Sequence, residues 1–264
     1  MMVTLLTDFG YKDEYVGLMK GVILRVNPSA TLVDLCHEVP PGDVVRAGWL
    51  LTWAWRYFPS GTVHVVVVDP GVGSTRKILL LEHQGHRFLA PDNGVLSPLL
   101  SGVKSPALYS VTNREYALSP VSSTFHGRDI LAPAAGYLSK GLSPRRLGPR
   151  VRQFKRLKVP TPKPLSSARW VGQVIDLDRF GNAVTNLPGS VVAQLSRQGQ
   201  PTVHVKGRSL KGVLPSYDGA GRGSPLAIVG GRSLLEIAVN RGSAARRLGL
   251  KVGDRVEVFG KRRS

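Results

Sequence analysis

Four polar side chains follow apolar, strand-like runs in the first half of this chain: Asp8, Asp69, Asp92 and His126. Ligands of open α/β sheets bind beyond the carboxyl ends of the strands, so we expect these residues to share one edge of a sheet. Each residue alone has a plainer interpretation, because Asp8 and Asp92 could cap helices and a single histidine is commonly a packing residue. Together they favour a binding or catalytic site.

The stretch TVHVVVVDPGVGSTRK, residues 62–77, is the centre of this predicted site. Its β-branched run at 63–68, interrupted only by His64, predicts a strand that is buried on both faces. Asp69 ends the run, and a glycine-containing loop leads to Arg76, which lets the two side chains face each other. The Asp-Pro-Gly sequence by itself would indicate only a turn.

Asp69, Arg76 and His126 could together orient a water molecule for nucleophilic attack. Arg76 would favour the hydroxide form of the water, Asp69 would accept a hydrogen bond from it, and His126 would exchange a proton. Spacing alone does not distinguish this trio from a structural ion pair.

The sequence predicts neither a metal ion nor an organic cofactor. One cysteine and six scattered histidines form no zinc-like cluster. The chain contains no GxxxxGK(S/T) phosphate-binding loop, and no GxGxxG follows the first predicted strand. We therefore do not expect a Rossmann dinucleotide site.

A second candidate site is the segment DRFGN at residues 178–182, between two predicted strands. The Gly-Asn pair is typical of a β-turn, which would explain the segment without any function. Alternatively, Phe180 would stack on a flat ring and the Asn182 amide would bind the edge of that ring.

The elements that must position these residues alternate between strand and helix up to about residue 158. The predicted strands cover residues 3–6, 31–35, 63–68, 78–82 and 87–90, and the run at 31–35 is expected to be buried. The predicted helices begin near Asp13, Asp43, Pro91 and Ile130. This alternation predicts an α/β domain at residues 1–158 with a doubly wound, mostly parallel sheet.

A proline-rich linker is predicted at residues 159–168, and the pattern changes after it. Short strands at 170–175, 203–206, 226–229, 234–239 and 255–259 alternate with glycine turns. We expect a smaller β-barrel-like domain at residues 169–264. The Gly-rich and basic segment at 207–223 has no predicted place in it.

The overall composition favours a cytoplasmic protein with a substantial core. The chain has 264 residues, 42% of them hydrophobic, and no apolar run long enough to cross a bilayer. Its N-terminus is typical of a first strand rather than a signal peptide, and a single cysteine fits a reducing compartment. We expect no membrane partner.

The net charge of +19 results from 36 Lys and Arg against 17 Asp and Glu. The densest basic run covers residues 145–158 and contains no acidic residue. Only 7% of the residues are aromatic, and no basic segment carries the interleaved aromatic residues of a nucleic-acid-binding module. The charge is therefore interpreted as a solvated face and not as a nucleic-acid site.

Five ordered motifs resemble those of one protein family: TDFG at 7–10, VVDPGVGSTR at 67–76, APDNG at 90–94, FHGRDI at 125–130 and DRFGNAVTNL at 178–187. These are similar to the S-adenosyl-L-methionine (SAM) hydroxide adenosyltransferases, or adenosine-forming SAM hydrolases, which are related to SAM-dependent fluorinase and chlorinase. The resemblance implies an N-terminal α/β domain, a C-terminal β-barrel-like domain, and a homotrimer with adenosyl sites between subunits.

The resemblance also implies roles for residues of the first domain. Asp69, Arg76 and His126 match the water-activating triad of the family. Asp8 matches the acid that holds the ribose hydroxyls, and Tyr15 is expected to line the same pocket.

In the second domain, Asp178 matches the residue that meets the methionine amino group of the substrate. Phe180 matches the ring that stacks on adenine, Asn182 the amide that binds its edge, and Val239 a backbone contact to it. Relatives usually carry Asn-Ser where this chain has Gly230-Gly231, so the resemblance assigns no contact there.

The implied reaction is hydrolysis of SAM, with selectivity for the (R)-sulfonium epimer, to adenosine and L-methionine. The halogenating relatives carry a tyrosine in place of Asp69 and a serine in place of Gly127, and a carboxylate would repel halide. Water is therefore the expected nucleophile. The alternatives are a basic RNA-binding or adenosine-sensing protein without turnover, and a SAM-dependent methyltransferase.

Overall fold

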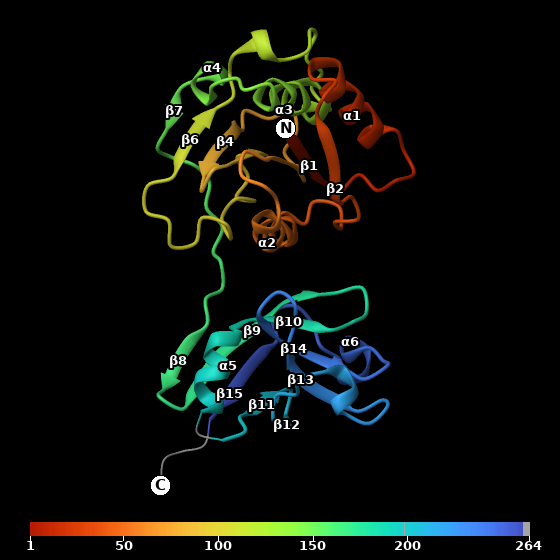
Figure 1. Cartoon of the computed structure of the whole chain (residues 1–264), viewed down its shortest axis with the longest axis vertical. Coiled ribbons are helices and arrows are strands. Elements are labelled where there is room, and N and C mark those ends of the chain that lie inside the picture. The colour runs from red at the N-terminus through yellow and green to blue at the C-terminus, as the bar shows by residue number, and fades with distance from the viewer. Residues whose placement is uncertain (198, 261–264) are drawn as a thin grey trace. The chain divides into compact units, whose positions relative to one another are not determined.

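A computed structural model of the chain describes residues 1–197 and 199–260 (Figure 1). The chain divides into two compact units, Met1–Val159 and Pro160–Ser264. Within the described ranges, no helix is long and apolar enough to cross a membrane.

Unit 1 is built on a seven-stranded sheet with the order β2-β1-β3-β5-β4-β6-β7. Its strands are β1 (Met2–Thr7), β2 (Thr31–Cys36), β3 (Val63–Val67), β4 (Ile78–His83), β5 (His86–Pro91), β6 (Ala107–Ser110) and β7 (Arg150–Val151). The pairs β1–β2, β1–β3 and β3–β5 are parallel, whereas β4 runs antiparallel to both β5 and β6, and β7 antiparallel to β6. Only β4 and β7 therefore oppose the common direction, which confirms a mostly parallel sheet.

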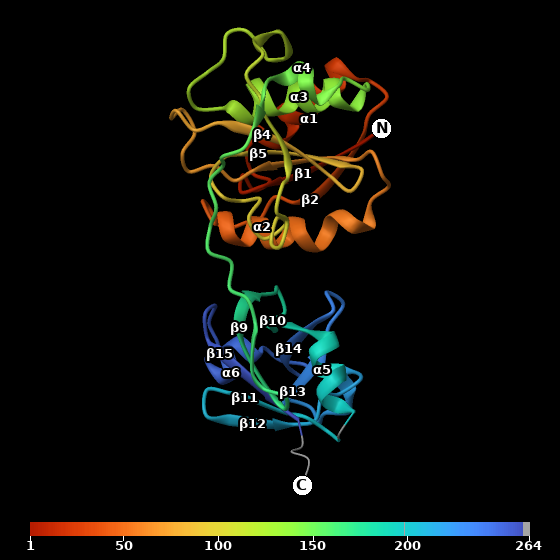
Figure 2. The ribbon, with the colours of Figure 1, turned by 90° about the vertical axis from the view of Figure 1, so that its left-hand side faces the viewer.

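Helices cover both faces of this sheet, as predicted for a doubly wound fold (Figure 2). The helices α1 (Tyr15–Val26) and α3 (Ala132–Ser139) lie on one face, and α2 (Val44–Ala54) lies on the other. Asp43 caps α2 by accepting a hydrogen bond from the Arg46 N–H. The short helix α4 (Pro144–Leu147) and a π-helical turn at Gly127–Leu131 complete the unit.

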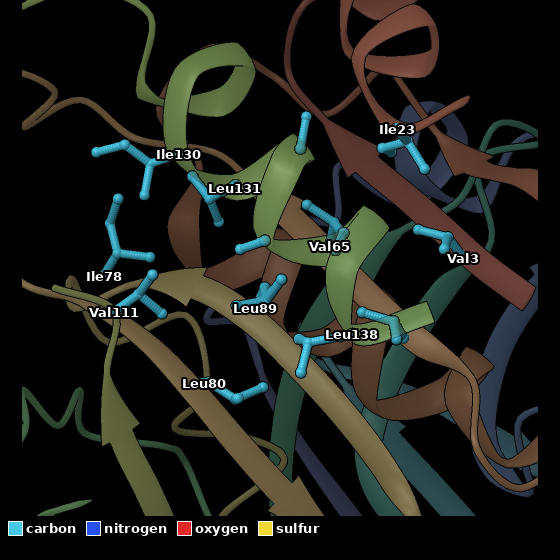
Figure 3. Close-up of a cluster of buried hydrophobic side chains, with 14 of the residues drawn as sticks. Val3, Ile23, Val65, Ile78, Leu80, Leu89, Val111, Ile130, Leu131 and Leu138 are labelled. Carbon is cyan, nitrogen blue, oxygen red and sulfur yellow. The ribbon is translucent and has the colours of Figure 1, made fainter. Parts of the chain in front are cut away.

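The central strand β3 is buried on both faces, as its β-branched sequence predicts. Val65 belongs to the cluster that packs below α3, together with Leu89 and Leu138 (Figure 3). Val66 belongs to the cluster on the other side of the sheet, beneath α2. Burial of β3 in two apolar layers therefore fixes the position of the residues at its carboxyl end.

Two expectations for unit 1 are wrong. The strand predicted to be buried at 31–35 is β2, which lies at an edge of the sheet, and none of its residues is fully buried. The helix predicted from Pro91 is a series of turns. Asn93 Oδ1 accepts the Val95 N–H, and Gly94 has φ +97°, a backbone conformation that no right-handed helix contains.

Unit 2 is an eight-stranded antiparallel sheet that curls into a nearly closed barrel. Its order is β12-β11-β15-β9-β10-β14-β13, with β8 also paired to β9. The strands are β8 (Lys163–Ser166), β9 (Arg169–Leu177), β10 (Ala183–Pro188), β11 (Thr202–Val205), β12 (Arg208–Lys211), β13 (Pro225–Val229), β14 (Leu234–Val239) and β15 (Arg255–Phe259). The helices α5 (Gly189–Ser196) and α6 (Ala244–Leu248) pack on its apolar core.

The predicted linker at 159–168 and the unplaced segment at 207–223 each contribute a strand to unit 2. Part of the proline-rich stretch at 159–168 forms β8, which pairs with β9. The segment at 207–223 contributes β12, and a short 3-10 turn at Tyr217–Gly219 follows. Both strands are mainly exposed in the structure. Their sequences therefore lack the alternation of apolar and polar residues that predicts a half-buried strand.

Candidate active site

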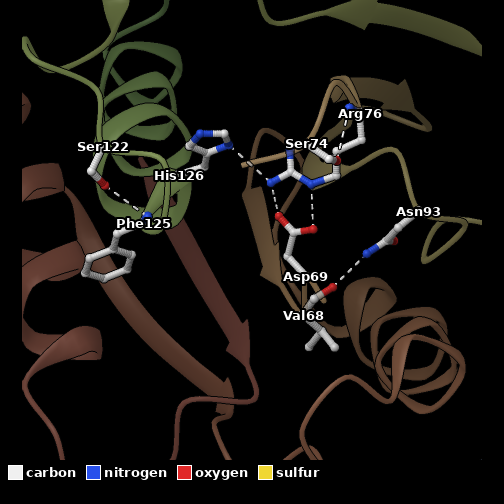
Figure 4. Close-up of polar contacts among 8 residues, drawn as sticks. All are labelled: Val68, Asp69, Ser74, Arg76, Asn93, Ser122, Phe125 and His126. Atoms are coloured by element: carbon white, nitrogen blue, oxygen red, sulfur yellow. Dashed lines mark hydrogen bonds and ion pairs between the residues drawn. The ribbon is translucent and has the colours of Figure 1, made fainter. Parts of the chain in front are cut away.

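The loop that follows β3 brings Asp69 and Arg76 against the segment before α3. Gly73 has φ +81°, and a β-carbon there would lie 2.4 Å from the backbone oxygen of Ser123. Only glycine permits this approach of the two backbones. Asn93 holds the end of the strand, since its Nδ2 donates to the Val68 oxygen at 2.8 Å (Figure 4).

Arg76 lies between the other two members of the predicted trio (Figure 4). Its Nε donates to Asp69 Oδ1 at 2.6 Å, and its Nη2 donates to Asp69 Oδ2. The same Nη2 is 3.2 Å from His126 Nδ1. The Arg76 and Asp69 side chains are only 9% and 5% exposed. The structure therefore brings all three residues into one hydrogen-bonded group.

The protonation of His126 follows from this contact. A guanidinium can only donate hydrogen bonds, so Nδ1 of His126 accepts and the ring proton of the neutral form lies on Nε2. Burial, and next the positive charge of Arg76, lower the pKa of His126 from its ordinary value of 6.5. His126 is therefore neutral at pH 7.

Asp69 and His126 line a pocket of about 400 Å³, and Asp8 lines it as well. Asp8 Oδ2 accepts the Gly42 N–H at 2.8 Å, which fixes the carboxylate at the end of β1. Asp92 does not line this pocket, since its Oδ1 accepts the Lys155 N–H at 2.7 Å. Three of the four predicted residues thus share one pocket, although His126 does not follow a strand: β6 ends at Ser110, and His126 directly precedes the π-helical turn.

Tyr15 lies in an adjoining hollow and not in the pocket that Asp8 lines. This hollow of about 470 Å³ includes Phe9 and Phe125, which also line the first pocket. The Tyr15 ring packs against both, with ring centroids 5.6 Å and 5.2 Å apart. Tyr15 therefore supports the aromatic wall between the two hollows.

In unit 2, the residues Asp178, Phe180, Asn182 and Val239 line one pocket of about 660 Å³. The segment 178–182 is a turn between β9 and β10, in which the Gly181 N–H donates to the Asp178 oxygen. Asn182 donates to the Asp178 carboxylate through both its backbone N–H and its Nδ2, at 2.8 Å each. The turn at 178–182 therefore forms part of the wall of this pocket.

Phe180 is 77% exposed although it is a large apolar residue. Its ring lines the pocket from a loop held by Gly181, where φ is +83° and a β-carbon would lie 2.0 Å from Ser243 Oγ. An exposed aromatic ring at a pocket can stack on the flat ring of a ligand.

Glu236 and Tyr217 line the same pocket and were not predicted from the sequence. Glu236 is 6% exposed, and Tyr217 Oη donates to its Oε2 at 3.5 Å. Burial raises the pKa of Glu236; the nearby Arg232 opposes this rise and Asp178 adds to it. The one sequence signal was a glutamate within the apolar strand LLEIAV of β14.

Comparisons with known proteins match both units of the chain to one protein family. The family model of the SAM hydroxide adenosyltransferase N-terminal domain matches residues 3–148, and that of the C-terminal domain matches residues 172–257. A Thermus thermophilus protein named (R)-S-adenosyl-L-methionine hydrolase is 37% identical over 97% of this chain and 99% of its own.

A Salinispora tropica protein of the same name is 36% identical over 97% of each chain. A solved structure of a conserved protein from Thermotoga maritima superposes with a TM-score of 0.91 and is 37% identical. That superposition covers 98% of this chain and 100% of the other.

Proposed function

This chain belongs to the SAM hydroxide adenosyltransferase family, and from this premise we propose that it hydrolyses SAM, as the (R)-sulfonium epimer, to adenosine and L-methionine. The observation that carries the proposal is the buried group of Asp69, Arg76 and His126 at the carboxyl end of β3. It lies beside a pocket that also holds Asp8.

In the proposed reaction, water attacks C5′ of the ribose while the bond from C5′ to sulfur breaks. The electron pair of that bond returns to the positively charged sulfur, so methionine leaves as a neutral thioether. The water loses one proton, which is finally released to solvent, and adenosine carries the new 5′-hydroxyl. Because the leaving group is already good, the enzyme must mainly align the water and stabilise its hydroxide character.

Asp69 is the proposed acceptor of the hydrogen bond from the water. Its two bonds to Arg76 hold the carboxylate in one orientation, and each oxygen retains a second lone pair. His126 Nδ1 already accepts from Arg76, so in this tautomer His126 presents its Nε2–H as a donor to the water oxygen. The positive charge of Arg76 favours the deprotonated water.

Asp8 is the proposed ligand of the ribose hydroxyls, because Gly42 orients its carboxylate in the pocket that Asp69 lines. In unit 2, the exposed ring of Phe180 would stack on adenine, and the Asn182 amide with the backbone at Val239 would bind its edge. Asp178 would meet the methionine amino group.

We further propose that the enzyme is a homotrimer with its substrate sites between subunits. Its support is the division of the proposed substrate residues between the two units and the resemblance of the motifs to a trimeric family. Light scattering at assay concentration is expected to give the mass of three chains. A fully active monomer would contradict the proposal.

The reaction requires no Lewis acid, because the sulfonium is already a charged leaving group. We therefore propose that turnover is independent of metal ions and is unchanged by a chelator. We also propose that the enzyme acts in the cytoplasm, where SAM is made and used.

The test is incubation with each sulfonium epimer of SAM, followed by chromatography of the products. Adenosine and L-methionine are expected, with faster turnover of the (R) epimer, and ¹⁸O from labelled water should appear in the 5′-hydroxyl. Formation of S-adenosylhomocysteine would instead indicate methyl transfer. Absence of any product from a folded protein would favour the non-catalytic alternative.

A further inference from the structure

A second polar pocket lies behind the triad, and we call it the rear pocket. It has a volume of about 260 Å³ and is lined by residues 74–78 and 110–114, with Ala117, His126 and Ile130. His126 lines both this pocket and the one that holds Asp8, whereas Asp69 lines only the latter and Arg76 only the rear pocket. The triad therefore separates two different environments.

Arg76, which lines the rear pocket, carries a hydrogen-bond donor that the described residues do not satisfy. Arg76 uses Nε and Nη2 for Asp69 and His126, but its Nη1 is buried and has no partner among those residues. Figure 4 shows this third nitrogen pointing away from the Asp69 carboxylate, and Arg76 lines the rear pocket. A buried guanidinium N–H without an acceptor is unfavourable, so the pocket should hold an acceptor.

The charges around the pocket indicate what that acceptor is. Lys77 and Arg114 also line it, and both are exposed. No Asp or Glu lines the pocket, and among residues 1–197 and 199–260 neither cation forms a salt bridge. A water molecule would satisfy Arg76 Nη1 but would leave Lys77 and Arg114 without a counter-charge, because Asp69 is already paired with Arg76. An anion satisfies both requirements.

The neutral groups of the pocket suit an anion with several oxygens. Ser110 and Thr112 line it, and each carries a hydroxyl that can donate one hydrogen bond. A tetrahedral oxyanion offers several acceptors in different directions, and its size is well below the volume of the pocket.

We propose that the rear pocket binds a small inorganic oxyanion, with Arg76 Nη1 as the buried donor and Lys77 and Arg114 as the outer cationic contacts. This site is separate from the proposed substrate pockets and does not depend on hydrolysis of SAM. A bound anion would also offset the positive charges that Arg76 and Arg114 place beside His126, so His126 reports on its occupancy.

The test is titration of the full-length protein with inorganic phosphate at constant ionic strength, measured by calorimetry. The double variant Lys77→Gln/Arg114→Gln removes the outer contacts. The matched control, Lys104→Gln/Arg152→Gln, removes the same charge from a separate basic hollow, which is lined by residues 104–106 before β6 and by β7 with the segment after it. We expect the wild type and the control to bind phosphate equally, and the rear-pocket variant at least about tenfold more weakly.

A site-specific readout accompanies calorimetry, since a protein of charge +19 attracts phosphate elsewhere too. The imidazole NMR signal of His126, assigned by its loss in His126→Gln, should titrate at higher pH when phosphate is present in the wild type. It should not respond to phosphate in the rear-pocket variant. Equal weakening in both double variants, or an unmoved His126 signal, would mean an adventitious ion only and would overturn the proposal.

Discussion

The backbone of Gly230 lies against the carboxyl group of Glu236: a β-carbon on Gly230 would be 2.1 Å from Glu236 Oε1. Glu236 is buried and lines the unit 2 pocket with Asp178, so its position affects what that pocket binds. Of the Gly-Gly pair at 230–231, which departs from the usual Asn-Ser of the resembling family, Gly230 thus has a physical explanation in this chain, whereas nothing in the structure explains Gly231. The Glu236 carboxyl occupies the space that a side chain at 230 would need.

Gly230→Ala should displace the Glu236 carboxyl and weaken substrate binding. We expect KM to rise several-fold, kcat to change less, and stability to fall by about 1–3 kcal/mol from overpacking. Gly221→Ala is the matched control, because Gly221 does not line the pocket and a β-carbon there would meet only Ser224 Oγ, at 3.5 Å. Steady-state kinetics and thermal unfolding measure both effects. Equal KM values for the two variants would show that the position of Glu236 does not matter for binding.

Asp69→Asn should remove most turnover, because it takes the negative charge from the group that we propose orients the water. A fall in kcat of about 10²–10³ is expected. The change also leaves the buried Arg76 guanidinium without its counter-charge, which should lower stability by about 3 kcal/mol. Asp92→Asn is the control, since Asp92 binds a backbone N–H away from the pocket. Near-normal kcat in a folded Asp69→Asn variant would exclude the assigned role.

Phe180→Ala should raise KM without loss of stability. The ring is largely exposed, so its removal leaves no cavity, but stacking on a base is worth about 1–3 kcal/mol. An increase in KM between about fivefold and a hundredfold follows. The control is Tyr57→Ala, which removes another exposed ring, one that lies in unit 1 and lines none of the described pockets. A KM unchanged by Phe180→Ala would rule out stacking at this position.

The rate should fall in acid with a midpoint below pH 6.5. Burial and the charge of Arg76 lower the pKa of His126, so the neutral ring persists below the pH at which a free histidine is protonated. Protonation removes the acceptor for Arg76 Nη2 and breaks the triad. Arg114→Gln should move the midpoint upward, because Arg114 also lowers this pKa. A profile of kcat/KM with its acidic midpoint at or above 6.5 would contradict this.

Stability should also fall in acid, for a separate reason that lies in the core. His64 is buried between Thr4 and His86, and burial lowers its pKa from 6.5 to about 3. Below pH 6.5 the unfolded chain binds this proton and the folded chain does not, so the free energy of unfolding decreases by up to about 1.4 kcal/mol per pH unit. Denaturant unfolding between pH 7 and 4 measures the slope.

A variant at the exposed His204 serves as the control for this slope. His204→Gln should leave the pH dependence as in the wild type, whereas His64→Gln should flatten it. The same slope in both variants would show that another group controls acid stability.

The main strands could be predicted because their signals are local. The β-branched run of β3 and the turn at 178–182 each depend on neighbouring residues, and both are found as expected. The motif residues of the triad could also be recognised in the sequence. The pairing of Asp69 with Arg76 lies within one loop, and their separation of seven residues was enough to anticipate that the two would face each other.

The errors and omissions arise where a distant segment decides the outcome. The apolar run at 31–35 resembles a buried strand, but its place at the sheet edge depends on the order in which all the strands pair. Asp92 follows a strand as Asp69 does, yet its carboxylate is used by the backbone of Lys155. Glu236 and Tyr217 meet only because β14 and the segment before β13 lie together in the barrel.

The sequence by itself determined which residues could activate water, because type, motif and loop spacing identify Asp69, Arg76 and His126. The tertiary structure alone decided that Arg76 would bridge the other two, that His126 would be neutral, and that Arg76 Nη1 would be buried without a partner among the described residues. The contact from Arg76 to His126 spans 50 residues and depends on Gly73 reaching the backbone of Ser123. Burial and the direction of a hydrogen bond arise only when such distant segments pack together, so no local pattern could specify them.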